Sequence, residues 1–161
     1  MFNPNIILKN ATQQMQLDAI LSLIARILMS YLFIVSGVGK YTNYAEIVAY
    51  MEASGVSGSL LPLTIILEVT GGLALLLGFQ TRLFAIVMAI CSLVTAVIFH
   101  NSAADMNNFM KNMVMAGGFI FLLLHGAGKF SLDQWIENYP LPFRLFPHPH
   151  PLLVILYSSY Y

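Results

Sequence analysis

Four long apolar runs separated by short polar segments set the pattern of this sequence, over residues 17–40, 59–78, 83–100 and 109–128. An α-helix rises about 1.5 Å per residue, and the hydrocarbon core of a bilayer is roughly 30 Å thick. Runs of this length therefore predict four transmembrane helices. The fourth is the weakest, because its uninterrupted apolar stretch is short.

The first run carries polar residues at regular intervals. Arg26, Ser30, Phe33, Gly37 and Lys40 follow one another at spacings of 4, 3, 4 and 3, so they share one stripe of a helix. A charge at that depth is costly against lipid tails, so the stripe must face protein or water. The run is too long for a cleaved signal peptide, and we expect a retained anchor.

The connecting segments complete the predicted fold. Between 44 and 55, apolar residues recur at helical spacing and two glutamates take the other face, which indicates a short interfacial helix. The short linker 79–82 makes its flanking helices antiparallel. The sequence thus predicts an all-α fold, a polytopic four-helix bundle of antiparallel transmembrane helices with an interfacial helix between the first two spans.

A proline-rich and apolar tail, residues 136–161, follows a single transmembrane domain of residues 1–135. Its prolines exclude a continuous helix, and its apolar end is too short to span a bilayer. His148 and His150 lie in this tail, but two histidines alone are a weak signal for a metal site, and no metal site is predicted.

Composition narrows the class of protein. Hydrophobic residues make up 58% of the chain and charged residues 9%, which indicates an integral membrane protein. Basic and acidic residues number 7 each and form no basic run, so nucleic-acid binding has no electrostatic basis. Cys91 is the single cysteine and cannot form an internal disulfide; we expect a small buried hydrophobe.

Loop charge predicts the orientation. With both termini in the cytoplasm, the inner segments hold Lys9, Arg82, Lys129 and Arg144, against Lys40 and Lys111 outside. Basic residues favour the cytoplasmic side, so we expect N- and C-termini in the cytoplasm.

Two charges are placed to meet inside the membrane. Counted from the inner ends of their helices, Arg26 lies roughly 10 Å deep and Glu68 roughly 15 Å deep. Lys40 lies roughly 16 Å closer to the outer side than Glu68 does. We therefore expect a buried ion pair between Arg26 and Glu68 and regard Lys40 as a poor partner. Such a pair either fixes helix register or handles protons or ligands.

A second polar cluster gathers at the outer helix ends and is net basic. It comprises Ser36, Lys40, His100, Asn101, Asn108, Lys111 and Asn112. The lysines either snorkel to the headgroups or line a pocket for an anionic or carbonyl-bearing ligand, where a histidine exchanges protons with a quinone head group. No Ser/His/Asp triad, phosphate loop, zinc helix or haem motif is present, so the catalytic residues are unknown.

Seven features in order resemble the DoxX family of small bacterial membrane proteins. They are Arg26, the SGxxK of Ser36, Gly37 and Lys40, AYMEASGV, Glu68 with Gly71 and Gly72, GFQTR ending in Arg82, Phe99-His100, and Lys111-Asn112. The resemblance extends over roughly residues 20–135. Members are four-helix membrane proteins, some described as quinol oxidase subunits, some similar to the large subunit of a thiosulfate:quinone oxidoreductase, and others linked to oxidative-stress complexes.

The resemblance implies a bacterial inner (plasma) membrane protein that binds quinone or supports a membrane oxidoreductase as a partner subunit. The sequence has no ligands for a covalently bound cofactor, so electron transfer would need quinone or a partner. Two alternatives stay open. One is a small-anion transporter-like module with Arg26 as the substrate counter-charge, and the other is a non-catalytic structural subunit. Membrane lipid surrounds the chain in each case.

Overall fold

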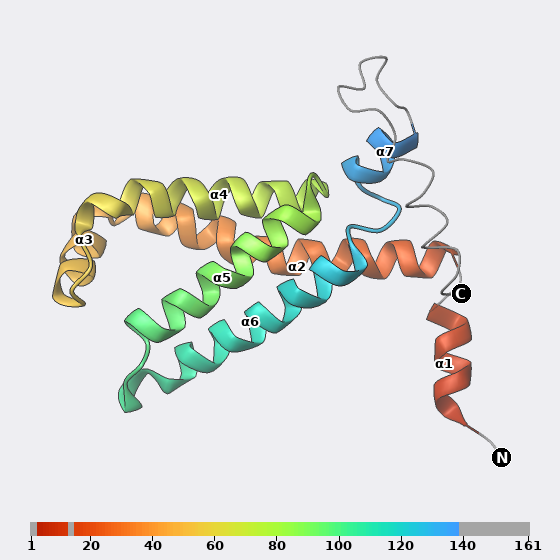
Figure 1. Ribbon diagram of the computed structural model, residues 1–161, viewed down its shortest axis with the longest axis horizontal. Coiled ribbons are helices and arrows are strands. Elements are labelled where there is room, and N and C mark those ends of the chain that lie inside the picture. Colours follow the sequence, from red (N-terminus) through yellow and green to blue (C-terminus); the bar gives the residue numbers. More distant parts are fainter. Residues whose placement is uncertain (1–2, 13–14, 139–161) are drawn as a thin grey trace, which may run out of the picture.

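The computed structural model describes residues 3–12 and 15–138, and every regular element in these residues is helical (Figure 1). In chain order the elements are α1 (Pro4–Thr12), α2 (Met15–Thr42), α3 (Tyr44–Ala53), η1 (Gly58–Leu60), α4 (Leu61–Leu77), α5 (Thr81–Phe99), η2 (Ala103–Asp105), α6 (Met106–His125) and α7 (Leu132–Asn138). The all-α prediction is confirmed for this part of the chain. The predicted features of the tail beyond 138, including His148 and His150, lie outside the described residues.

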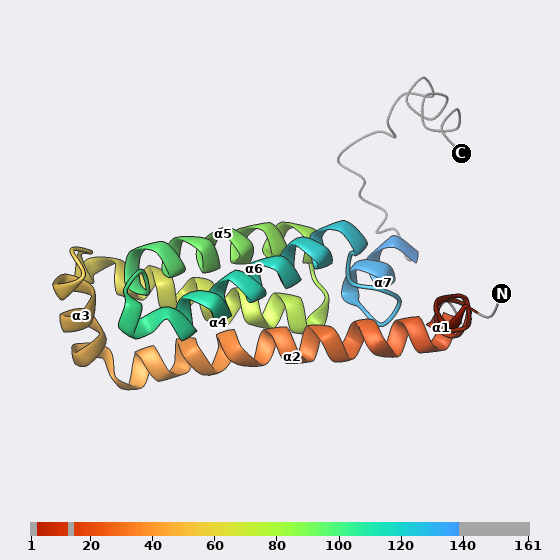
Figure 2. The same cartoon turned by 90° about the horizontal axis from the view of Figure 1, so that it is seen from below.

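The long helices α2, α4, α5 and α6 run side by side with alternating direction (Figures 1 and 2). Helix α2 packs chiefly on α4, helix α6 packs chiefly on α5, and α4 joins the two pairs through α5. The pairs diverge toward the end where α3 and η2 lie, which we call the open end. At the opposite or closed end, the α4–α5 turn and the segment after α6 lie together.

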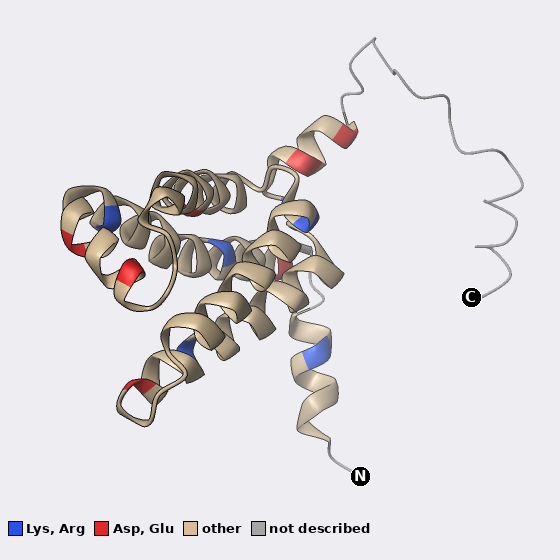
Figure 3. Cartoon of the chain, turned by 60° about the vertical axis from the view of Figure 1, so that its left-hand side comes forward, with Lys and Arg blue, Asp and Glu red and all other residues tan. Residues whose placement is uncertain are grey.

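Three helical segments of the described residues are long and apolar enough to cross a membrane: Gln16–Thr42, Gly58–Leu77 and Thr81–Phe99. They correspond to the first three predicted spans. The fourth predicted span corresponds to α6, which starts earlier than expected, at Met106, with polar residues in its first two turns. Most charges lie near the ends of the long helices or on the short helices, as Figure 3 shows.

Small residues bring α4 close to both of its neighbours. A Cβ on Gly37 of α2 would lie 2.7 Å from an α4 side chain, and a Cβ on Gly72 would lie 2.7 Å from an α2 side chain. A Cβ on the adjacent Gly71 would lie 2.6 Å from the sulfur of Met88 in α5. In membranes, such close approach supplies dispersion energy between helices. The adjacent glycines therefore allow close packing on two faces of α4, Gly72 against α2 and Gly71 against α5.

The buried core lies where the four long helices meet, and it comprises Phe33, Leu75, Ala85, Met88, Ala89, Phe119 and Leu122. The rings of Phe33 and Phe119, whose centroids are 5.3 Å apart, join α2 to α6 at mid-height. The predicted stripe on α2 is confirmed: Arg26, Ser30, Phe33 and Gly37 are buried, and Lys40 is partly buried.

An aspartate from α7 caps the first turn of α5. Asp133 Oδ1 accepts a hydrogen bond from Gln80 N at 2.6 Å, and Oδ2 accepts one from Thr81 N at 2.9 Å. The Asp133 amide donates to Gly78 O at 2.8 Å. A carboxylate at a helix N-terminus satisfies free amides and complements the helix dipole. The segment after α6 is thereby tied to the α4–α5 turn.

Replacing Asp133 with alanine is expected to lower the free energy of unfolding by about 1–2 kcal/mol, because two amides of α5 lose their acceptor. Thermal unfolding in detergent measures the effect. Glu137→Ala is the matched control, since Glu137 is an exposed carboxylate on the same helix. An equal loss in both variants would show that the cap contributes nothing specific.

Candidate functional site

A pocket of about 480 Å³ lies between the two helix pairs at the open end. Its volume is within the range of about 300–1,000 Å³ typical of small-molecule sites. It is lined by Tyr31, Leu32, Phe33, Val35, Ser36, Lys40, Glu68, Cys91, Ser92, Thr95, His100, Asn108, Lys111, Asn112 and Met115. The structure thus brings together all five residues predicted to bind a ligand, Ser36, Lys40, His100, Lys111 and Asn112. Of the predicted cluster, Asn101 is exposed and outside the pocket lining.

An ion pair between α2 and α4 forms one side of the pocket. Lys40 Nζ lies 2.7 Å from both carboxylate oxygens of Glu68 and donates to Ser36 Oγ, also at 2.7 Å. The side chains are 25% and 12% exposed for Lys40 and Glu68. The predicted pairing of Glu68 with Arg26 is wrong, and so is the inference that Lys40 lies too far out to reach Glu68.

The offset between α2 and α4 explains most of this difference: a Cβ on Gly37 would lie 3.3 Å from Glu68 Cβ, so the backbone of Lys40 lies only about one turn beyond Glu68. The direction of the Lys40 side chain accounts for the rest. In a helix the Cα–Cβ bond tilts toward the N-terminus, which for α2 points away from the open end and into the bundle. The bond to Ser36 shows that the ammonium lies about one turn, or about 5.4 Å, deeper than the Lys40 backbone. Depth counted along the backbone missed this displacement. The snorkelling interpretation is therefore wrong for Lys40, whose ammonium points inward.

Arg26 lies instead at the closed end, where it is fully buried. Its Nη1 donates to the carbonyls of Leu75 at 3.3 Å and Leu76 at 3.1 Å, and its Nη2 donates to Phe130 O. The last carbonyls of a helix have no partner within the helix, and a cation there complements the helix dipole. Arg26 thus caps α4 and holds the segment after α6 against it, rather than lining the pocket.

A glycine makes room for this guanidinium. Gly78 ends α4 in the left-handed region, with φ of 67°, and a Cβ there would clash with Arg26 Nη1. Arg82 caps α6 in the same way from the surface, donating to the carbonyls of Leu123 at 2.9 Å and Leu124 at 3.0 Å. Two arginines therefore cap the two helices that end at the closed end.

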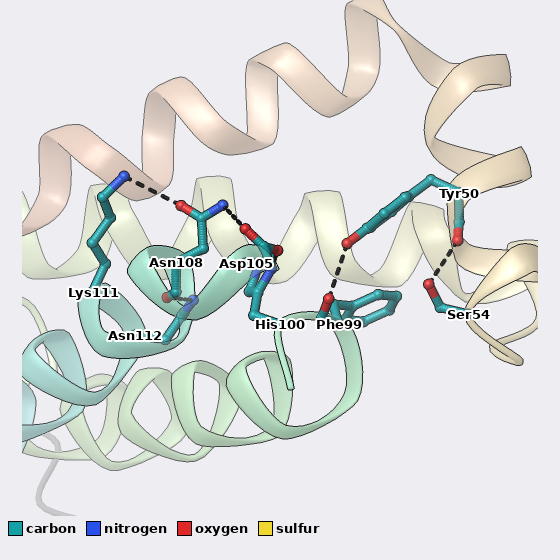
Figure 4. Close-up of polar contacts among 8 residues, drawn as sticks. All are labelled: Tyr50, Ser54, Phe99, His100, Asp105, Asn108, Lys111 and Asn112. Atoms are coloured by element: carbon teal, nitrogen blue, oxygen red, sulfur yellow. Dashed lines mark hydrogen bonds and ion pairs between the residues drawn. The ribbon is translucent and has the colours of Figure 1, made fainter. Parts of the chain in front are cut away.

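A chain of hydrogen bonds connects the pocket to the loop between α5 and α6 (Figure 4). His100 Nδ1 bonds Asp105 Oδ2, and Asn108 Nδ2 donates to Asp105 Oδ1 at 2.6 Å. Lys111 Nζ donates to Asn108 Oδ1 at 3.2 Å, and Asn112 Nδ2 donates to Asn108 O at 2.9 Å. The order along the chain is thus His100, Asp105, Asn108 and Lys111.

Asp105 is the member of this chain that sequence reasoning missed. It is the one carboxylate of the polar loop between the third and fourth apolar runs, five residues after His100, and that isolation was the available signal. The hydrogen bond with His100 is the main reason that the pKa of the Asp105 carboxyl is lowered from its ordinary value of 3.8. Asp105 is therefore ionised at neutral pH and orients the His100 ring.

This contact determines which ring nitrogen serves the pocket. A carboxylate on Nδ1 favours the tautomer that carries its proton there, which leaves Nε2 as an acceptor. Within the described residues, Nε2 has no hydrogen-bond partner. Next to His100, Tyr50 of α3 donates to Phe99 O at 3.2 Å, which ties α3 to the end of α5.

The pocket lining holds Lys40, Lys111 and Glu68, so the positive charge of the predicted cluster is reduced to one unit, and Asp105 just outside the lining offsets part of the rest. Lys40 is paired with Glu68, and Lys111 is linked through Asn108 to Asp105. The two carboxylates were not assigned to this end of the bundle from the sequence, which accounts for the difference. Cys91 lies partly buried in the wall as a free thiol. No group of three or more His, Cys, Asp or Glu side chains in the described residues is placed to hold a metal.

Comparisons with known proteins place this geometry in a family context. The sequence model of the DoxX family matches residues 21–101, which include α3, α4 and α5 and most of α2. Inner membrane protein YqjF of Escherichia coli (strain K12) is 49% identical over 119 residues, covering 72% of this chain and 92% of that protein. Inner membrane protein YphA of the same organism is 34% identical over 125 residues, covering 71% and 89%. No solved structure matches the chain significantly.

Proposed function

This chain belongs to the DoxX family, and from that premise we propose that its polar pocket binds the head group of a quinone, as a quinone-associated subunit of a membrane oxidoreductase. The observation that carries the proposal is the convergence of Lys40, His100 and Lys111, from three helices, on one pocket with apolar walls. The names of the relatives state a membrane and no ligand.

The chain is a multi-pass protein of the bacterial inner membrane, given its apolar helices and its inner-membrane relatives. We propose that α6 is the fourth span of a four-helix transmembrane bundle with α3 at the interface. Helix α6 has 20 residues and lies along α5, and its polar Asn112 is buried while Met110, Val114 and Phe121 are exposed for lipid. Four spans and the loop charges support cytoplasmic termini, with the open end on the periplasmic side.

The pocket offers what a quinone ring needs. Such a ring is apolar on its faces and carries carbonyl oxygens at its edge, so it requires apolar walls and hydrogen-bond donors. Phe33, Leu32 and Met115 supply apolar surface. Lys111 Nζ carries three N–H groups, of which the described residues engage one, through Asn108, and the Thr95 hydroxyl in the wall is a further donor.

Charge balance favours a neutral ligand over an anion. Because Lys40 is neutralised by Glu68, the remaining charge of the lining is Lys111, which Asp105 partly offsets from outside the lining, so little positive charge is left for an anion to neutralise. The transporter alternative also loses its counter-charge, since the donors of Arg26 are directed at backbone carbonyls at the closed end. A neutral, carbonyl-bearing head group meets these conditions.

A bound quinone supplies reversible uptake of electrons together with protons. The residues of the chain would orient it and exchange protons with it. Lys111 would donate a hydrogen bond to a ring oxygen, and His100 Nε2 would take up a proton from the quinol hydroxyl or return it. Asp105 holds the imidazole in place.

Substituting Lys111 with glutamine is expected to lower the affinity for quinone at least about tenfold, since a hydrogen bond from a charged group contributes about 1.5–3 kcal/mol. Substituting His100 with alanine is expected to lower the affinity for the reduced quinol, whose hydroxyl donates to Nε2, by up to about tenfold, since a neutral hydrogen bond contributes about 0.5–1.5 kcal/mol. Quinone that co-purifies is measured by extraction and mass spectrometry, and affinity by titration of the purified protein. His125→Ala and Lys129→Gln, at the closed end, are the matched controls and should bind normally.

Quinone binding that survives both pocket substitutions would remove the pocket from the proposal. A wild-type protein that binds no quinone but forms a stable complex with other membrane proteins would support the structural-subunit alternative instead.

A further inference from the structure

A second hollow lies on the outside of the bundle, along the seam between α2 and α6. It is a groove of about 530 Å³, lined by Leu32 of α2 and by Asn107, Met110, Lys111, Val114 and Met115 of α6. Val114 is 75% exposed and Met110 is 51% exposed. In a bilayer these surfaces face lipid, so the groove opens toward the hydrocarbon.

The seam between α2 and α6 is closed near the middle of the bundle and is open from there to the open end. The rings of Phe33 and Phe119 meet across it, and a Cβ on Gly118 would lie 3.2 Å from Met29. From there to the open end, α2 follows α4 and α6 follows α5, and the two pairs diverge (Figure 1). The groove occupies this divergent part of the seam.

The groove and the polar pocket share part of their lining. Leu32, Lys111 and Met115 line both. The pocket therefore adjoins a lipid-facing, mainly apolar groove, and these three side chains lie at the boundary between them. Lys111 lies at the junction, where its stem contributes to the groove and its ammonium reaches Asn108.

We propose that the ligand of the pocket is a tailed amphiphile, which enters from the bilayer through the α2–α6 seam and leaves its hydrocarbon tail in the groove. This inference rests on the proposed quinone function and specifies the substrate class, a quinone with a long hydrocarbon tail. Because the groove and the pocket are adjacent, one ligand can place its head in the pocket and its tail in the groove, once the side chains at their boundary move aside. Met110 and Met115 are flexible apolar side chains that adapt to an irregular chain.

The same arrangement excludes small charged solutes from this route. An ion passing through a lipid-facing opening would lose its hydration with no charged partner in the apolar part of the groove, which is costly. A hydrocarbon tail exchanges lipid contacts for contacts with Leu32, Val114 and the methionines. The seam therefore selects for a ligand that is already dissolved in the membrane.

The test compares a tailless benzoquinone with quinones of the same ring carrying two and eight isoprene units, using the full chain in nanodiscs. Val114→Trp fills the groove, because Val114 lines the groove and not the pocket. Leu28→Trp is the control, on the lipid-exposed surface of α2 and outside both linings. We expect Val114→Trp to weaken binding of the tailed quinones at least tenfold and to leave the tailless ring within twofold of wild type, with Leu28→Trp unchanged for both.

The outcomes separate the two proposals. If the wild type binds tailed and tailless rings equally and Val114→Trp changes neither, the groove inference is overturned while the pocket stands. If no quinone of any tail length binds to the wild type, the proposed function fails and the inference with it.

A second groove variant covers a local effect of one tryptophan. Met110 also lines the groove and not the pocket, so Met110→Trp should likewise lose the tailed quinones selectively. Unchanged binding of the tailed quinones in both variants overturns the inference.

Discussion

Glu68→Gln is expected to lower the free energy of unfolding by about 3 kcal/mol. Removing one partner of a buried ion pair costs about 3–5 kcal/mol, because the other charge stays buried and unpaired. The lower end applies, since Lys40 retains 25% exposure of its side chain while Glu68 retains 12%. Thermal or denaturant unfolding in detergent measures the loss, with Glu46→Gln on the exposed surface of α3 as the control.

Double variants separate charge from packing. Lys40→Met combined with Glu68→Leu removes both charges and should recover most of the loss, because a buried pair replaced by apolar side chains is often neutral in stability. The exchange Lys40→Glu with Glu68→Lys should recover part of it. An unchanged unfolding midpoint in Glu68→Gln would show that the pair does not stabilise the contact between α2 and α4.

Arg26→Met is expected to cost about 3 kcal/mol or more, because three backbone carbonyls lose a charged donor inside the bundle. Arg26→Lys keeps the charge, but a single ammonium does not reproduce the planar fork that reaches both α4 and the segment after α6, so it should recover little. Unfolding of the purified variants in the same detergent gives the comparison.

Arg82 provides a matched control of the same residue type. It also donates to two carbonyls at the end of a helix, but it is exposed to solvent. A surface cation at a helix C-terminus contributes about 0.3–1 kcal/mol, so Arg82→Met should cost no more than that. Equal losses for the two arginines would contradict the claim that burial makes Arg26 the main clamp of the closed end.

The positions of the helices were predictable from the sequence, since an apolar run of sufficient length forms a helix in a membrane whatever its neighbours are. The stripe on α2 was predictable for a related reason: helical periodicity and the cost of a charge in lipid decide which face is buried. Antiparallel connection also predicted that Lys40, His100 and Lys111 share one end of the bundle. These conclusions need one helix at a time and the order of the chain.

The partners of the charged residues were decided by the tertiary structure. Whether Glu68 meets Lys40 or Arg26 depends on the offset between α2 and α4 and on the direction of a long side chain, and a count of residues along each helix gives neither. Asp133 reaches Thr81 across 52 residues of chain, and no local pattern indicates that contact. Backbone carbonyls as partners of Arg26 leave no trace in the sequence at all.

The groove is likewise a product of packing. It exists because α2 packs on α4 and α6 packs on α5, so that the seam between the pairs is left open between Phe33 and Phe119 and the open end of the bundle. The apolar residues along it look in the sequence like any lipid-facing surface. The sequence by itself determines which segments enter the membrane, because that depends on local hydrophobicity, whereas side-chain partners and cavities depend on how far and at what angle separate helices lie from one another.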